Sequence, residues 1–326
     1  MTLDPGWLYL RDQRASAAAV PLYEQTVAEA RAADLASIRA GSGPVEHVDQ
    51  VVDRTFAGPD DERPVRVYRP ASTGPLPVVV YFFGGGWTLG SIDTADAVAR
   101  RLAVAVPAVV VVPGYRLAPE HPFPAAVEDC YAAVRWAAAH AARLGGRADR
   151  IAVAGDSAGG NLAAVTALLA RDRSGPVLAG QALIYPNTDY TAADASLREN
   201  ADRWLFNTTS VGWYWSHYLR DPADGTNPLA SPALAGDHCG LPPALILTAG
   251  HDPLRDQGER YAAILRAAGV RTELRRYTTM AHGFFTMTGV LDAAGQAQRQ
   301  VADALRDWCG VAAPPVRRAN TVEHGP

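Results

Sequence analysis

Residues 155–159 read GDSAG, and they join an apolar strand pattern at residues 151–154 to an alanine-rich helical pattern at residues 161–170. A serine between two glycines at such a junction fits a sharp turn that exposes its hydroxyl, because small neighbours let the two backbone segments approach closely. The same motif alone would also fit a helix N-terminus with Ser157 as an ordinary cap. The preceding strand and two partners further along the chain favour Ser157 as a nucleophile.

An acid and a histidine follow Ser157 along the chain, each after a later strand pattern, in the order serine, acid, histidine. Asp252 and His282 each come just after a predicted strand. A serine oxygen is a poor nucleophile at neutral pH, so it needs an imidazole base and a carboxylate that orients the imidazole. Asp256 is the weaker choice of acid because it belongs to the next helical pattern. The sequence therefore predicts a triad of Ser157, Asp252 and His282.

The remaining seven histidines are weaker candidates for the base than His282. His121 precedes a proline and His251 is next to the predicted acid, so these two are candidates for supporting positions behind the triad. The other five lie in helical patterns, before the first strand, in a loop or in the tail, where surface or packing roles are the default interpretation.

The composition excludes several classes of function. All 30 basic residues are arginine, which rules out a lysine Schiff base, a pyridoxal phosphate attachment site, a Walker phosphate loop and a serine–lysine dyad. The net charge of -4 and the lack of a basic run argue against nucleic acid or an anionic membrane surface as a partner. We expect a neutral small-molecule substrate, with no cofactor.

The cysteines and the N-terminal segment indicate the cellular compartment. Cys130, Cys239 and Cys309 are far apart and lack metal-ligand spacing, so we expect reduced thiols and no metal site. The N-terminus lacks the pattern of a signal peptide, and no apolar run is long enough for a membrane span. The sequence thus predicts a cytoplasmic protein, and a homodimer is left open.

Alternating strand and helix patterns predict an α/β fold with one eight-stranded, mostly parallel sheet. A hydrophobic content of 48% is ample for its core. The first two strands alternate in polarity, which indicates an outer antiparallel pair. The expected strands are residues 48–56, 65–69, 78–83, 108–112, 151–154, 181–184, 244–249 and 272–277, and the main helical patterns are residues 7–40, 124–144, 161–170 and 290–309.

Five spaced motifs occur in one order along most of the chain. They are GGGW at residues 84–87, YRLAPE at 115–120, GDSAGG at 155–160, DPLRD at 252–256 and HGF at 282–284. On these motifs the chain resembles the hormone-sensitive-lipase-like branch of the α/β-hydrolase fold, the bacterial group of esterases and lipases. The resemblance implies hydrolysis of carboxylic esters through an acyl-enzyme without a cofactor. It also implies that the backbone N–H groups of Gly85, Gly86 and Ala158 form an oxyanion hole.

The resemblance further implies a division into core and cap. Residues 1–45 and the insertion at residues 186–235 would cover the active site, over a core of residues 46–185 and 236–310, and the Pro-rich residues 311–326 read as a disordered tail. The insertion is rich in aromatic residues, of which about half are expected to face the substrate. The candidate pocket residues are Phe83, Trp87, Trp204, Phe206, Trp213 and Tyr214.

Phe83 departs from the pattern of that family, which usually has a histidine before the oxyanion glycines. None of the expected oxyanion donors belongs to residue 83, so aromatic packing could replace the histidine and preserve hydrolysis. Alternatively, the scaffold is recruited for a non-hydrolytic step on a bulky, natural-product-like substrate, such as elimination, cyclisation or decarboxylation. A third possibility is a catalytically dead binding protein. Hydrolysis of esters with an apolar or ring-containing part is the leading hypothesis.

Overall fold

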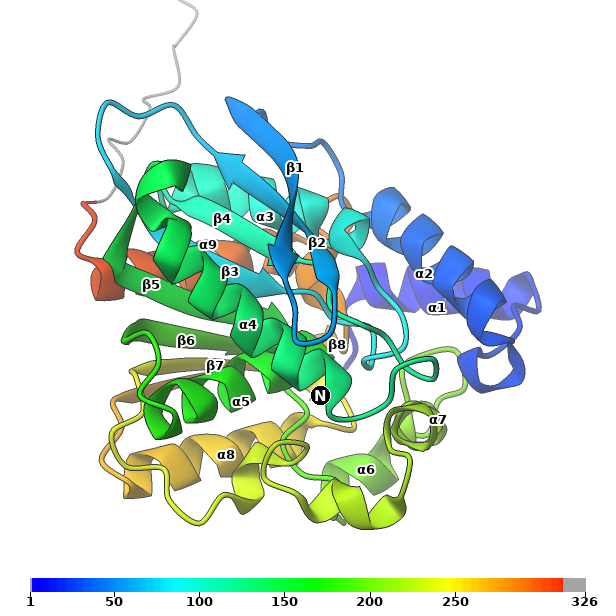
Figure 1. Cartoon of the computed structure of the whole chain (residues 1–326). Coiled ribbons are helices and arrows are strands. Elements are labelled where there is room, and N and C mark those ends of the chain that lie inside the picture. The colour runs from blue at the N-terminus through cyan, green and yellow to red at the C-terminus, as the bar shows by residue number, and fades with distance from the viewer. Residues whose placement is uncertain (1, 313–326) are drawn as a thin grey trace, which may run out of the picture.

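Eight strands form one sheet with the order β1-β2-β4-β3-β5-β6-β7-β8 in the computed structural model, which describes residues 2–312 (Figure 1). β2 is antiparallel to both β1 and β4, and all other neighbours are parallel. The predicted α/β fold and its outer antiparallel pair are confirmed. The strands are β1 (Gln50–Ala57), β2 (Glu62–Arg69), β3 (Leu76–Phe82), β4 (Val109–Pro113), β5 (Gly146–Asp156), β6 (Leu178–Ile184), β7 (Ala244–His251) and β8 (Thr272–Ala281).

Helices cover both faces of this sheet, as Figure 1 shows. One face carries α3 (Ile92–Ala105) and α9 (Asp292–Cys309), which contact each other, and the other carries α4 (Ala125–His140), α5 (Ala158–Asp172) and α8 (Arg255–Ala267). Strands that are covered on both faces must be apolar throughout rather than alternating. β3 and β4 accordingly consist of buried residues over their whole length.

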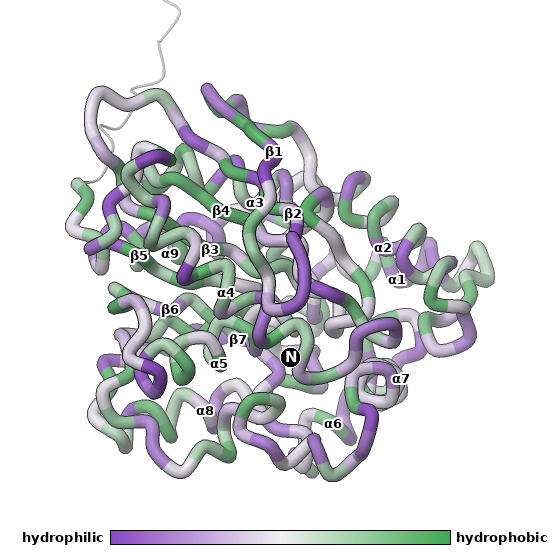
Figure 2. Tube along the Cα trace, viewed as in Figure 1, coloured by the Kyte–Doolittle hydropathy of each residue, from purple (hydrophilic) through white to green (hydrophobic). Residues whose placement is uncertain are grey.

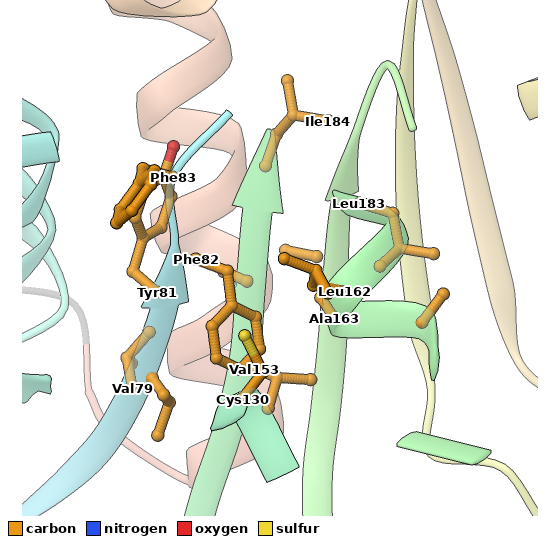
Figure 3. Close-up of a cluster of buried hydrophobic side chains, with 14 of the residues drawn as sticks. Val79, Tyr81, Phe82, Phe83, Cys130, Val153, Leu162, Ala163, Leu183 and Ile184 are labelled. Atoms are coloured by element: carbon orange, nitrogen blue, oxygen red, sulfur yellow. The ribbon is translucent and has the colours of Figure 1, made fainter. Parts of the chain in front are cut away.

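The centre of the core lies where β3, β5 and β6 meet α5. Figure 2 shows hydrophobic segments in the interior, where these strands lie, and many polar segments toward the outside. Successive side chains of a strand point to opposite faces, and Figure 3 shows Tyr81 and Phe83 on one side of β3 and Phe82 on the other. Phe82 packs into the fully buried core near Val153, and Tyr81 and Phe83 are buried on the other side of the strand.

The N-terminal region differs from the single helical pattern expected for residues 7–40. It forms two helices, α1 (Pro5–Ser16) and α2 (Val27–Gly41), with a 3-10 turn at Leu22–Glu24 between them. Thr26 starts α2 with a capping box, since its side chain accepts from the N–H of Glu29 and the Glu29 carboxylate accepts from the Thr26 N–H. Such a cap begins a new helix at a defined residue, which explains the break.

Two further helices lie beside the N-terminal pair, at the same end of the molecule (Figure 1). They are α6 (Ala195–Glu199) and α7 (Thr208–Tyr218). Arg11 of α1 donates a 2.5 Å hydrogen bond to Asp202, and Arg14 donates one of 3.0 Å to the carbonyl of Trp204. The N-terminal helices and the α6–α7 segment are therefore held together although they are far apart in sequence.

The C-terminal helix α9 ends at Gly310, whose left-handed backbone (φ 64°) terminates it. The expectation of a disordered tail concerns residues 311–326, of which residues 313–326 lie outside the described part of the chain. No helix within residues 2–312 is long and apolar enough to cross a membrane.

Candidate active site

Ser157 stands on a sharp turn between β5 and α5. Its backbone has φ 55° and ψ -119°, in the left-handed half of conformational space that non-glycine residues seldom occupy. The two glycines of the motif make room for the turn, because a Cβ at Gly159 would lie 2.0 Å from the carbonyl oxygen of Phe82 and one at Gly155 would lie 2.3 Å from that of Gly159. The Ser157 N–H donates to Ile184 of the neighbouring strand at 2.8 Å, so the sheet fixes this strained residue.

His282 and Asp252 complete a hydrogen-bonded chain that starts at Ser157. Nε2 of His282 lies 2.9 Å from Oγ of Ser157, and Nδ1 lies 2.8 Å from Oδ2 of Asp252. The other oxygen of Asp252 accepts from the N–H of Leu254 at 2.8 Å, which fixes the fully buried carboxylate. Asp256 instead binds the Arg255 guanidinium and the backbone N–H of Ser196. The structure thus places Asp252, and not Asp256, at the histidine.

Two aromatic rings hold the imidazole of His282. Phe206 stacks on it with ring centroids 4.2 Å apart, and Tyr185 approaches at 4.5 Å. In a neutral imidazole with its proton on Nδ1, that nitrogen donates to the carboxylate and Nε2 is left to accept the serine proton. The geometry therefore suits removal of a proton from Ser157 by His282.

The glycine loop after β3 lies next to this chain of hydrogen bonds. Asp156 anchors it, since Oδ1 accepts from the Tyr81 hydroxyl at 2.7 Å and from the N–H of Gly84 at 3.0 Å. Burial raises the pKa of the Asp156 carboxyl, while these two donors and the nearby His282 oppose that rise. Within residues 2–312, the N–H groups of Gly85 and Gly86 bind no other protein group. The N–H of a residue in the first turn of a helix, such as Ala158, likewise has no intrahelical partner.

Phe83 contributes its ring and its carbonyl to the same loop. The ring is buried and stacks on Tyr115 at 4.2 Å with an interplanar angle of 17°, and the Tyr115 hydroxyl donates to the Phe83 carbonyl oxygen at 2.7 Å. The hydrogen bond uses the backbone carbonyl of Phe83, and the stacking uses the face of its ring. The loop is consequently held without a hydrogen-bonding side chain at this position.

A cavity of about 410 Å³ opens beside Ser157 and His282. Four of the six predicted pocket residues line it: Phe83, Trp204, Phe206 and Tyr214. Tyr214 lies close to the glycine loop, because a Cβ at Gly86 would fall 2.0 Å from its ring. The loop after β3 and the α6–α7 segment thus form part of the cavity wall.

Trp87 and Trp213 do not line this cavity, which corrects the expectation for both. The left-handed backbone of Trp87 (φ 57°) turns its indole onto α7, where it stacks on Tyr218 at 4.1 Å and 4° and meets Trp215 at 4.6 Å. Trp213 contacts His217 at 4.2 Å. Because successive helical residues point about 100° apart, Tyr214 faces the cavity and its neighbour Trp213 does not.

Comparison with known proteins identifies the family. The profile of the alpha/beta hydrolase fold family matches residues 79–286, a range that includes the glycine loop, the serine turn and His282. The chain belongs to the alpha/beta hydrolase fold family. It is 44% identical to the carboxylic ester hydrolase LipN of Mycobacterium tuberculosis over 289 residues, covering 87% of this chain and 77% of LipN. It is 48% identical to the carboxylesterase NlhH of the same organism over 247 residues, or 74% of this chain and 77% of NlhH.

A solved structure shows the same architecture over nearly the whole chain. The hyperthermophilic esterase from Pyrobaculum calidifontis superposes with a TM-score of 0.89 at 41% identity, and the match covers 94% of this chain and 99% of that one. The hydrolase fold thus extends to the helices at the N-terminus, beyond the residues that the family profile matches.

Several residues of this hydrolase site were not anticipated. Tyr81, Tyr115 and Asp156 brace the glycine loop, and Tyr115 could have been noticed because it opens the YRLAPE motif. The resemblance implies that residues 1–45 cover the active site, but the helical patterns of α1 and α2 do not tell which of their side chains face the cavity. The lining residues from these two helices include Trp7, Arg14, Ala30, Ala33, Asp34, Ser37 and Ile38.

The two candidate supporting histidines lie in different places. His121 is exposed in the segment before α4. His251 is the last residue of β7 and pairs in register with Ala281, the residue before His282. Of the two, only His251 occupies a position next to the backbone that carries His282.

Proposed function

We propose that this alpha/beta hydrolase is a carboxylic ester hydrolase that works through an acyl-enzyme, with Ser157 as nucleophile, His282 as base and Asp252 as the orienting acid. The observation that carries the proposal is the chain of two hydrogen bonds, 2.9 and 2.8 Å long, that joins these side chains at a strained turn. The names of LipN and NlhH as ester hydrolases support the same chemistry.

The reaction follows from these roles. His282 Nε2 takes the proton of Ser157 as Oγ attacks the ester carbonyl carbon, and the imidazolium is stabilised by the ionised Asp252. The carbonyl oxygen becomes an oxyanion, the bond to the alcohol breaks, and the alcohol leaves with the proton from His282. A water molecule then loses a proton to His282 and attacks the acyl-enzyme, which releases the acid and restores the Ser157 hydroxyl.

The oxyanion is held by the N–H groups of Gly85, Gly86 and Ala158. Two of these donors bind no other protein group within the described residues, and the third belongs to the first turn of a helix. Fixed donors of this kind act where charge develops in the transition state. In this assignment Phe83, which stands in place of the usual histidine of the oxyanion motif, serves as packing and as cavity wall.

Residues 1–45 and 186–235 act as a cap over the core of residues 46–185 and 236–310. Side chains from both segments line the cavity, and hydrogen bonds from Arg11 and Arg14 connect them. The lining includes aromatic rings from the second segment, and the volume is in the range of small-molecule sites. The substrates we propose are esters with an apolar or ring-containing part.

The cytoplasm is the compartment we assign. Cys130, Cys239 and Cys309 are all unpaired, and unpaired thiols are typical of a reducing environment.

The test combines turnover with covalent labelling. Purified protein should hydrolyse nitrophenyl esters of short and medium acyl chains and should be labelled by a fluorophosphonate, and both signals should disappear in Ser157→Ala. Labelling without turnover on any ester would instead support a recruited scaffold that catalyses a non-hydrolytic step. Absence of both signals in a folded protein would contradict the proposal.

A further inference from the structure

One face of α2 forms part of the cavity wall and carries two polar side chains. The lining positions repeat at intervals of three and four residues, which places them on one side of a helix. Two of them are alanines, which leave space in front of the helix. The lining residues of α2 are Ala30, Ala33, Asp34, Ser37 and Ile38.

Asp34 lacks a donor for one of its oxygens. Its Oδ2 atom is covered and accepts no hydrogen bond from the residues that the structure describes. Burial and the nearby Asp156 carboxylate raise the pKa of Asp34 to about 7, and the backbone N–H of Gly90 only partly opposes this. Asp34 as a whole is only partly buried and lines the cavity, so a ligand there can exchange hydrogen bonds with its carboxyl group.

Apolar side chains surround much of the same cavity. Leu89, Val98 and Met287 are all buried, and each belongs to its wall. Between such apolar side chains a well-placed hydrogen-bonding group helps to fix how a ligand is oriented. Asp34 is therefore a candidate determinant of specificity rather than of the chemical step.

We propose that Asp34 and Ser37 form a subsite for a hydroxyl group carried by the aliphatic part of the ester, so that hydroxylated esters are preferred over their plain counterparts. This subsite rests on the proposed ester hydrolysis. A hydroxyl both donates and accepts, and it can donate to Asp34 while accepting from the Ser37 hydroxyl. An ammonium group would meet the like charges of Arg14 and Arg203 in the same cavity wall, which disfavours it.

The first experiment measures turnover of matched ester pairs. The pairs are nitrophenyl butanoate, hexanoate and octanoate with their ω-hydroxy counterparts, which vary the reach from Ser157. Wild-type protein should show a higher kcat/KM for the hydroxy ester of at least one pair. Asp34→Leu should lower that preference by about 10- to 100-fold, as expected for a hydrogen bond to a carboxyl group.

A matched control distinguishes this effect from a general change of charge. Asp12 lies on α1 with a side chain that is 65% exposed and paired with Arg11, and Asp12→Leu should keep the wild-type preference. Ser37→Ala should reduce the preference less than Asp34→Leu, because it removes only the weaker, neutral partner. An equal preference in wild-type protein and Asp34→Leu would overturn the subsite.

A binding measurement keeps the subsite testable apart from catalysis. In a Ser157→Ala background, calorimetry should give a Kd for the preferred hydroxy ester at least about tenfold below that for the plain ester, and Asp34→Leu should remove the difference. Failure of wild-type protein to cleave any ester would contradict the proposed function alone. Identical Kd values for both esters at every chain length would contradict the subsite alone.

Discussion

The Tyr115 hydroxyl donates a 2.7 Å hydrogen bond to the carbonyl oxygen of Phe83, while the two rings stack 4.2 Å apart. This pair fixes the start of the glycine loop through the backbone of residue 83, and Asp156 fixes the next residue by accepting from the N–H of Gly84 at 3.0 Å. The aim of the loop N–H groups therefore depends on two side chains that contact no reacting atom. Both are positioning residues in the proposed mechanism.

Tyr115→Phe tests this role because it keeps the stacked ring and removes only the hydroxyl. We expect kcat for a nitrophenyl ester to fall about tenfold with little change in KM, since poorly aimed oxyanion donors weaken binding of the transition state more than that of the substrate. Tyr68→Phe is the matched control, because Tyr68 lies on β2 and its hydroxyl donates a 2.9 Å hydrogen bond to Asp96 of α3, away from the glycine loop. Equal kcat losses in the two variants would mean that the hydroxyl contributes only to stability.

Ser157→Ala should abolish ester turnover while leaving the fold intact. Removal of a triad serine typically lowers kcat about a million-fold. Circular dichroism and the thermal transition should stay close to those of wild-type protein, because loss of one small hydroxyl at a strained turn removes little packing. Near-native turnover in this variant would show that another group is the nucleophile.

Asp252→Asn and Asp256→Asn form a pair that separates the two acids of one short segment. An asparagine at 252 can no longer orient the imidazole in the productive tautomer, so kcat should fall about 10⁴-fold. Asp256 binds Arg255 and Ser196 instead, and we expect its substitution to lower kcat less than about tenfold. Losses of similar size at neutral pH would contradict the assignment of Asp252.

The sheet could be predicted from the sequence because buried parallel strands are continuous apolar runs. Each of the eight strands overlaps a range expected from the sequence, although β8 extends to Ala281, beyond the expected end at residue 277. The grouping of Ser157, Asp252 and His282 could also be predicted. Each follows a parallel strand, and parallel strands bring their carboxyl ends to one edge of the sheet. These inferences use only local pattern and strand order.

Contacts between distant elements could not be predicted in this way. Asp34 faces the cavity through the docking of α2, and a helical period does not say which element a face will meet. Trp87 follows the loop glycines directly, yet its left-handed backbone turns the ring toward α7. That backbone conformation is set by the folded loop and leaves no trace in the local sequence.

Asp34→Asn should change how stability depends on pH. The folded-state pKa of Asp34 is raised from 3.8 to about 7, so between these values the folded protein keeps a proton that the unfolded chain has released. Wild-type protein therefore loses stability as pH rises from about 4 to 7. Asparagine does not ionise, so the stability of the Asp34→Asn variant should not fall for this reason as pH rises.

We expect the variant to gain stability over wild-type protein by about 1–2 kcal/mol between pH 5 and pH 8, or roughly 2–5 °C in Tm. The measurement is a set of thermal scans of both proteins across that range. The two proteins differ only at residue 34, so the difference between the two curves isolates the contribution of Asp34. A Tm difference that stays constant with pH would show that Asp34 ionises at its ordinary value.

Phe83→His tests whether the aromatic residue serves the loop or the substrate. If a histidine side chain would aim the oxyanion donors better, the variant should hydrolyse simple activated esters faster, because a well-aimed donor contributes up to about 3 kcal/mol in a transition state. The structure argues against this outcome, since Tyr115 and Asp156 already hold the loop. We expect simple acetate esters to change less than about threefold.

Bulkier esters should respond differently to the same change. The Phe83 ring forms part of the cavity wall and stacks on Tyr115, and a smaller, polar ring would remove apolar contact with the substrate. We expect kcat/KM for long-chain or ring-containing nitrophenyl esters to fall about tenfold, mainly through KM. Both ester classes are measured on the same two proteins, with circular dichroism to check folding. A faster reaction with acetate esters and no loss with bulky ones would show that residue 83 acts on the loop and not on the substrate.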